Sequence, residues 1–194
     1  MKPDQHNSTC PMVSVCISTS EWGANIQKAI DSILVQTHWN WEIVVIHNCD
    51  RRLTEVVLEQ YQRRYFDRIQ VVKTDTDRSH ETLATGLMHS HGKYLSMLSP
   101  TDHMPQRRLA NEVAYLESNS KARAVCSVAE HSVEETAVMS GRRRQEVLYR
   151  LGDAGNLNLG AQLVGGRSMM VRRKVATDLL VILAHAATPY QMVG

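Results

Sequence analysis

Residues 94–109 read YLSMLSPTDHMPQRRL, and this stretch decides the fold of the chain. It begins with a short apolar run that predicts a strand, continues through an acidic turn that contains proline, and then opens into a helix. Asp102 falls where the end of a strand could offer a carboxylate to a metal-bound phosphate. An Asp beside a Pro is also a common turn or helix-capping residue, so the surrounding segments must decide between the two roles.

Length and composition indicate one domain. The chain has 194 residues, of which 43% are apolar, enough for one domain that buries about 70% of its unfolded surface. Lys and Arg number 22 against 20 Asp and Glu, so there is no overall positive field of the kind that attracts nucleic acid. No apolar run approaches the ~18–20 residues of a membrane span, and the start is polar, unlike a signal peptide. We therefore expect a soluble, cytoplasmic protein.

The four cysteines favour the same compartment. Cys10, Cys16, Cys49 and Cys126 form no CxxC pair and no His/Cys cluster with the spacing of zinc ligands. Two of them fall within or at the end of apolar runs that predict strands. We interpret them as buried free thiols in a reducing compartment.

Runs that predict strands alternate with stripes that predict helices. Residues 13–17 and 42–46 are short β-branched runs, typical of strands buried on both faces of a parallel sheet. Between them, apolar residues recur at helical spacing from Ile26 to Leu34. The alternation favours an α/β domain with an open, mostly parallel sheet, helices on both faces, and ligand-binding loops at the carboxyl ends of the strands. The further predicted elements are a helix over 53–65, a strand over 68–73, a helix over 81–90, strand 94–98, a helix over 106–117, strand 122–128 and a helix over 174–183.

Four blocks, PMVSVCISTS, AIDSILVQTHWNWEIVVIHN, GLMHSHGKYLSML and LANEVAYLESN, occur in this order and resemble the family 2 glycosyltransferases, whose fold is called GT-A. The resemblance covers roughly residues 11–119, with a weaker similarity at 165–173. It implies a Rossmann-like nucleotide-binding half. We accordingly expect a polar tail over residues 1–10, a GT-A-like core over 11–128 and an incomplete acceptor-side segment over 129–194.

The resemblance also implies which residues bind a nucleotide. Ser18, Thr19 and Ser20 match the turn after the first strand that contacts the base and ribose, although such hydroxyls also cap helices. Asn48 and Asp50 fall in the loop after the second strand. Asn48 matches the acid that hydrogen-bonds the base, and its amide can both donate and accept such bonds. A simple loop turn is the alternative for Asn48.

The loop after residues 94–98 is expected to carry the metal chemistry. In the family, one carboxylate touches the ribose and another binds the Mg²⁺ or Mn²⁺ that bridges the diphosphate. Asp102 matches the metal ligand, Thr101 the ribose-facing residue and Ser99 an earlier acid. One carboxylate can suffice for a weakly held divalent cation, because Mg²⁺ commonly takes one or two protein ligands and fills its other positions with phosphate and water.

The implied activity is that of a hexosyltransferase of polysaccharide biosynthesis. It would transfer a sugar from a nucleoside-diphosphate sugar, in the first place a UDP-sugar, to a glycan or lipid-linked acceptor with inversion. The alternative is a catalytically impaired binding or assembly domain of a larger protein or complex. Leu83 and Ala84 stand where the family often has Arg and Asn, and the Arg there helps hold the diphosphate. Only Asp178 follows the segment beyond which the family's general base is expected, and no base is assigned.

Short basic runs at residues 142–144 and 172–174 leave a second question open. They could contact an anionic lipid or phosphate, which would place the protein at the inner face of a membrane. Runs of this length are also common on solvated helix faces.

Overall fold

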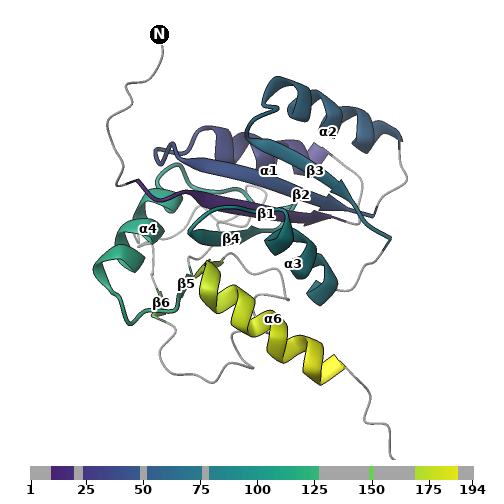
Figure 1. Ribbon diagram of the computed structural model, residues 1–194. Coiled ribbons are helices and arrows are strands. Elements are labelled where there is room, and N and C mark those ends of the chain that lie inside the picture. The colour runs from purple at the N-terminus through teal and green to yellow at the C-terminus, as the bar shows by residue number, and fades with distance from the viewer. Residues whose placement is uncertain are drawn as a thin grey trace, which may run out of the picture.

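The computed structural model of the chain describes residues 10–19, 24–48, 52–75, 79–126, 149–150 and 169–187. Within them a single sheet is flanked by helices (Figure 1). The strands are β1 (Val13–Thr19), β2 (Trp41–His47), β3 (Ile69–Lys73), β4 (Tyr94–Leu98), β5 (Ala124–Cys126), β6 (Tyr149–Arg150) and β7 (Met169–Arg172). The helices are α1 (Ala24–Leu34), α2 (Arg52–Arg64), α3 (Ser79–Met88), α4 (Arg108–Ser118) and α6 (Arg173–Ala187).

The sheet has seven strands in the order β3-β2-β1-β4-β7-β5-β6. Strands β3, β2, β1 and β4 are parallel, whereas β7 runs antiparallel to both β4 and β5. This confirms the predicted α/β fold with an open, mostly parallel sheet. The carboxyl ends of β1, β2, β3 and β4 lie along one side of the sheet, here called the carboxyl edge. Their starts, together with the end of β7, form the opposite amino edge.

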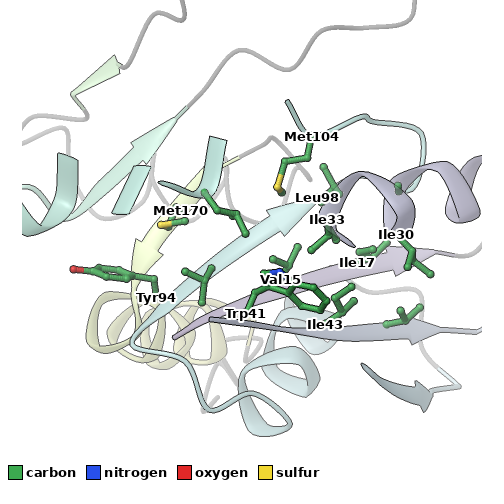
Figure 2. Close-up of a cluster of buried hydrophobic side chains, with 14 of the residues drawn as sticks. Val15, Ile17, Ile30, Ile33, Trp41, Ile43, Tyr94, Leu98, Met104 and Met170 are labelled. Atoms are coloured by element: carbon green, nitrogen blue, oxygen red, sulfur yellow. The ribbon is translucent and has the colours of Figure 1, made fainter. Parts of the chain in front are cut away.

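Two apolar clusters cover the two faces of the sheet, as expected for strands buried on both sides. One cluster packs β1, β2 and β4 against α1 and α4, and Figure 2 shows Val15 and Ile17 of β1 beside Ile30 and Ile33 of α1. The other packs the opposite face of the same strands against α3 and α6, and it includes Cys16. Burial raises the pKa of the Cys16 thiol to about 12, so this thiol is a neutral packing group.

The predicted buried free thiol is therefore confirmed for Cys16, and Cys10 is a free thiol that is only partly buried. Cys49 and the side chain of Cys126 lie outside the described residues. The basic run at 142–144 also lies outside them. No helix in the described ranges combines the length and the apolar character that a bilayer span requires.

The helix predicted from residue 106 begins at Arg108 instead. The preceding residues run along α1 and use their backbone groups in tertiary hydrogen bonds. The Met104 N–H donates to Ser32 Oγ at 3.0 Å, and the Thr37 N–H donates to the Gln106 carbonyl at 2.9 Å. Helical periodicity in the sequence does not reveal such bonds, and they keep residues 104–106 out of the helix.

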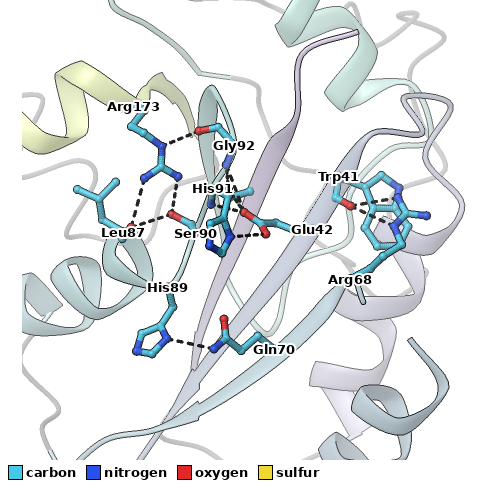
Figure 3. Close-up of polar contacts among 11 residues, drawn as sticks. Trp41, Glu42, Arg68, Gln70, Leu87, His89, Ser90, His91, Gly92 and Arg173 are labelled. Carbon is cyan, nitrogen blue, oxygen red and sulfur yellow. Dashed lines mark hydrogen bonds and ion pairs between the residues drawn. The ribbon is translucent and has the colours of Figure 1, made fainter. Parts of the chain in front are cut away.

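At the amino edge, one carboxylate fixes the connection from α3 to β4 (Figure 3). Glu42 accepts hydrogen bonds from Ser14 Oγ at 2.6 Å and from the backbone N–H groups of His91 and Gly92. From the other side, Arg173 Nε donates to the Gly92 carbonyl at 2.7 Å. A Cβ at Gly92 would lie 2.6 Å from the Ser14 nitrogen, so the close approach of the two chains requires glycine here.

Candidate functional site

The carboxyl edge brings together the ends of the strands that carry the predicted site residues. Thr19 at the end of β1 lies beside His47 at the end of β2, and Ile17 lies beside Leu98 at the end of β4. The Asn48 N–H donates to the Thr19 carbonyl at 3.4 Å. Because neighbouring strands are about 4.8 Å apart, the loops after β1, β2 and β4 open at adjacent positions on one edge.

Side chains at the end of β1 divide between solvent and core. The Ser18 side chain is exposed and Thr19 is buried, since successive side chains of a strand point to opposite faces. Asn48 is half-buried in the loop after β2. Ser20 and Asp50, which the sequence also places at the site, lie outside the described residues. Ser18 and Asn48 are thus side chains that a ligand at this edge can reach.

His47 is a further polar residue at this edge, and the sequence reasoning did not select it as a site residue. It is buried at the end of β2, and its carbonyl accepts a hydrogen bond from the Thr74 N–H at 2.9 Å. Its ring atom Nδ1 is buried without a hydrogen-bond partner among the described residues. Buried polar atoms without partners are uncommon in folded proteins. The signal in the sequence was a polar residue directly after the apolar run of β2.

The loop after β4 contains the predicted metal ligand. Ser99 Oγ and Thr101 Oγ1 lie 2.9 Å apart, and the Asp102 N–H donates to the Ser99 carbonyl at 3.0 Å. Thr101 is exposed, whereas Asp102 is buried. The hydrogen bonds that close this turn come from backbone atoms of Asp102 and from the two hydroxyls. These bonds hold Ser99, Thr101 and Asp102 together in one turn.

The chemistry of the donor set fits a weakly held hard cation. Asp102 is accompanied at this edge by the hydroxyls of Ser18 and Thr101 and the amide of Asn48, and oxygen donors suit Mg²⁺ or Mn²⁺. Within the described ranges there is no group of three or more His, Cys, Asp or Glu side chains that could hold a metal. A cation here would need most of its ligands from phosphate and water.

A buried glutamine anchors the segment that follows Asp102. Gln36 Nε2 donates to the carbonyls of Met104 at 3.2 Å and Pro105 at 2.8 Å. Gln36 Oε1 accepts a hydrogen bond from the Leu109 N–H at 3.1 Å. Because the residue before α4 provides no side-chain cap, Gln36 satisfies one of the free N–H groups of the first turn of this helix. The signal in the sequence was a polar residue at the end of the apolar stripe of α1.

The two expected departures from the family pattern are visible in the structure. Leu83 of α3 is buried in the apolar cluster between the sheet and α6, so this position offers no contact to a phosphate. Asp178 is exposed on α6.

Comparisons with known proteins agree with this architecture. A family model described as "Glycosyl transferase family 2" matches residues 14–180. The putative glycosyltransferase EpsE of Bacillus subtilis is 31% identical over 110 residues, which are 56% of this chain and 40% of EpsE. An uncharacterised glycosyltransferase of Haemophilus influenzae is 30% identical over 145 residues, 74% of this chain and 43% of that protein. The chain thus spans less than half the length of these relatives.

Solved structures show the same fold. The mannosyltransferase PcManGT from Pyrobaculum calidifontis, in complex with GDP-Man and Mn²⁺, has a TM-score of 0.56 and 24% identity over 62% of this chain and 36% of that one. S. aureus TarS 1–349 in complex with UDP-GlcNAc has a TM-score of 0.61 and 17% identity over 86% of this chain and 47% of that one. At these identities the likeness establishes the fold.

Proposed function

Because this chain belongs to glycosyl transferase family 2, we propose that it is the nucleotide-sugar-binding domain of a hexosyltransferase that uses a UDP-sugar and a divalent cation. The observation that carries the proposal is Asp102, a carboxylate in the loop that follows β4, on the edge where β1 and β2 also end. Solved structures that share the fold contain GDP-Man with Mn²⁺ or UDP-GlcNAc, which supports a nucleotide sugar as ligand.

Each residue has a role that follows from its chemistry. Asp102 would hold Mn²⁺ or Mg²⁺, and the bound cation would neutralise charge on the diphosphate as it departs. Asn48 would pair with the edge of the base through its amide, and Thr101 would face the ribose through its hydroxyl. Ser18 and Thr19 would border the nucleotide from the end of β1. Ser20 and Asp50 remain predictions for the same site.

The proposed reaction is sugar transfer with inversion to a hydroxyl of a glycan or lipid-linked acceptor. The acceptor oxygen forms a bond to the anomeric carbon while the bond from that carbon to the diphosphate breaks, and the hydroxyl proton passes to a base that is not assigned. Polysaccharide biosynthesis in the cytoplasm, at the inner face of a membrane, is the proposed setting. One relative that is 26% identical over 114 residues is named a putative teichuronic acid biosynthesis glycosyltransferase, TuaG of B. subtilis.

A catalytically impaired binding or assembly domain is the second candidate. Two observations favour it: the buried, apolar Leu83 at a position expected to contact phosphate, and the single carboxylate at the metal position. Incubation of the chain with UDP-sugars, Mn²⁺ and candidate acceptors separates the two candidates. Metal-dependent sugar transfer supports the enzyme, and nucleotide binding without turnover supports the binding domain.

Calorimetric titration of UDP with and without Mn²⁺ tests the role of Asp102. Asp102→Ala should weaken UDP binding in Mn²⁺ by roughly 10-fold or more, and change binding without metal little, because the cation loses its matched protein ligand. Asp178→Ala, which removes an exposed carboxylate from α6, is the matched control. Unchanged metal-dependent binding in Asp102→Ala would remove Asp102 from the site.

Competition between nucleotides tests Asn48 separately. Asn48→Ala should reduce the preference for UDP over other nucleoside diphosphates by roughly fivefold, about the contribution of one hydrogen bond. Asn119→Ala, at the exposed end of α4 near the amino edge, is the control. A preference that survives in Asn48→Ala would return Asn48 to the status of a turn residue.

A further inference from the structure

The amino edge of the sheet carries most of the large apolar side chains that the described part of the chain exposes. Val35 and Trp39 are 54% and 60% exposed in the connection from α1 to β2. Phe66 is 83% exposed in the turn before β3, and Met88 is 82% exposed at the end of α3. Large exposed apolar residues elsewhere in the described ranges are confined to Val56 and Val181. Such clustering marks a surface that contacts another phase or molecule.

Arg68 holds the two exposed aromatic residues on adjacent connections. Its N–H donates to the Tyr65 carbonyl at 2.9 Å and closes the turn that contains Phe66. Its guanidinium donates to the Trp39 carbonyl and lies 3.4 Å from the centre of the Trp41 ring, a stacking that Figure 3 shows. Arg68 thus links the two connections that carry Trp39 and Phe66.

The same edge contains a basic cavity. It has a volume of about 520 Å³ and is lined by Lys93, Arg172, Arg173 and Lys174, with walls formed mainly by the carbon stems of these side chains. The hydrogen bonds that Arg172 and Arg173 donate to described residues go to carbonyl and hydroxyl oxygens rather than to carboxylates. The nearby Glu117 carboxylate interacts with the charge of Arg172. Lys93 pairs with Glu117 at 2.6 Å in an exposed position.

Positive charge continues along the edge. The described lysines and arginines outnumber the described carboxylates of this edge, which are Glu42, Glu59, Asp67 and Glu117, and Glu59 pairs with Arg63 at 3.2 Å. Besides the residues of the cavity, the cations are Arg63, Arg64, Arg68, Lys121 and Arg123. Four strand spacings separate β3 from β7, so the aromatic pair and the basic cavity lie about 19 Å apart across one surface.

We propose that the amino edge docks on an anionic lipid bilayer. Trp39 and Phe66 would lie at the level of the headgroups, and Lys93 and Lys174 would face lipid phosphates. A polyanion such as nucleic acid would engage the cations but leave the exposed apolar side chains in water, whereas a bilayer interface accommodates both. The carbon-walled, cation-lined cavity suits a phosphate attached to a hydrocarbon chain.

This surface gives the proposed membrane-side location a physical basis and does not depend on sugar transfer. β1 has seven residues, so the carboxyl edge lies about 23 Å from the amino edge. With the amino edge on the bilayer, the nucleotide site would stay open to soluble nucleotide.

Co-sedimentation of the chain with vesicles tests the proposal. The chain should bind vesicles of phosphatidylcholine with phosphatidylglycerol but not of phosphatidylcholine alone, and high salt should release it. Lys93→Gln/Lys174→Gln should lower the partition coefficient roughly 30-fold, because each basic residue at an anionic surface contributes about a factor of five. Lys28→Gln/Lys73→Gln, at exposed positions off this edge, gives the same net charge and should bind nearly as well as the parent.

A second pair of measurements isolates the aromatic contribution. Trp39→Ser/Phe66→Ser keeps the charge and should reduce binding to anionic vesicles. The tryptophan emission of the parent, which has three tryptophans, should shift to the blue when vesicles are added, and the shift should be smaller in this variant. Urea unfolding verifies that each variant is folded. Three outcomes would each overturn the proposal: the chain does not bind anionic vesicles, the two lysine double variants lose vesicle binding equally, or the chain binds duplex DNA but not vesicles. No nucleotide is present, so these outcomes are independent of the UDP titrations.

Discussion

Replacement of Gln36 by leucine should destabilise the fold and displace the Asp102 loop together. The substitution keeps the size of the side chain but removes the hydrogen bonds to Met104, Pro105 and Leu109. A hydrogen bond contributes about 1 kcal/mol net, and a buried group left without a partner costs about 1–3 kcal/mol. The Leu109 N–H and the Met104 carbonyl both lose a buried partner, so we expect a loss of about 2–4 kcal/mol. That is a large part of the roughly 5–15 kcal/mol that stabilises a domain.

Urea unfolding of Gln36→Leu and of Gln106→Leu measures this loss. Gln106 is exposed two residues before α4, so the same substitution there controls for the change in polarity. Calorimetry with UDP and Mn²⁺ at a temperature where both variants are folded then reports on the loop. Metal-dependent binding should weaken in Gln36→Leu only. A difference below about 0.5 kcal/mol between the two variants would refute the reasoning, because surface substitutions alone vary by that amount.

Two further predictions concern charged groups in the scaffold. Burial raises the pKa of Glu42, but hydrogen bonds from Ser14 and His91 outweigh this effect and hold the pKa below its ordinary 4.5. The ionised Glu42 therefore contributes its full stabilisation above pH 4.5, and this contribution is lost as the pH falls through the lowered pKa. In thermal unfolding, Glu42→Gln should therefore lose less stability on acidification than the parent or the exposed control Glu59→Gln. Equal losses would contradict the lowered pKa of Glu42. Arg108 and Glu112 form a 2.9 Å ion pair with side chains 1% and 0% exposed. Arg108→Met should cost about 3–5 kcal/mol because it removes the cation that pairs with a buried carboxylate. Adding Glu112→Gln should recover part of that loss in urea unfolding, and no recovery would show that the two charges are not coupled.

Most of the fold could be predicted from sequence periodicity. β1 and β2 are buried on both faces, so their residues form continuous β-branched runs, and α1 between them carries a single apolar stripe. These patterns are local, and burial alone fixes them. The start of α4 was misplaced by two residues because the segment before it bonds to α1, a contact between positions about 70 residues apart.

The site could be predicted only in part. Strand ends locate the loops, so Ser18, Asn48 and Asp102 fall at one edge as the topology requires. The buried residues that contact those loops are set by three-dimensional packing, and no spacing in the sequence predicts them. Gln36 and His47 were missed for that reason, since each occurs as a single polar residue beside an apolar run.

The contacts that hold the carboxyl edge are distinct from the groups that would bind a ligand. Gln36 fixes the segment after Asp102, and backbone bonds to Thr19 and Ser99 fix the neighbouring turns. None of these bonds is made by an acidic side chain, so they form whether or not a cation is bound. Stability therefore cannot distinguish an active transferase from a binding domain. Metal-dependent nucleotide affinity can distinguish them, because it reports the contribution of the Asp102 carboxylate to binding on a scaffold that both candidates share.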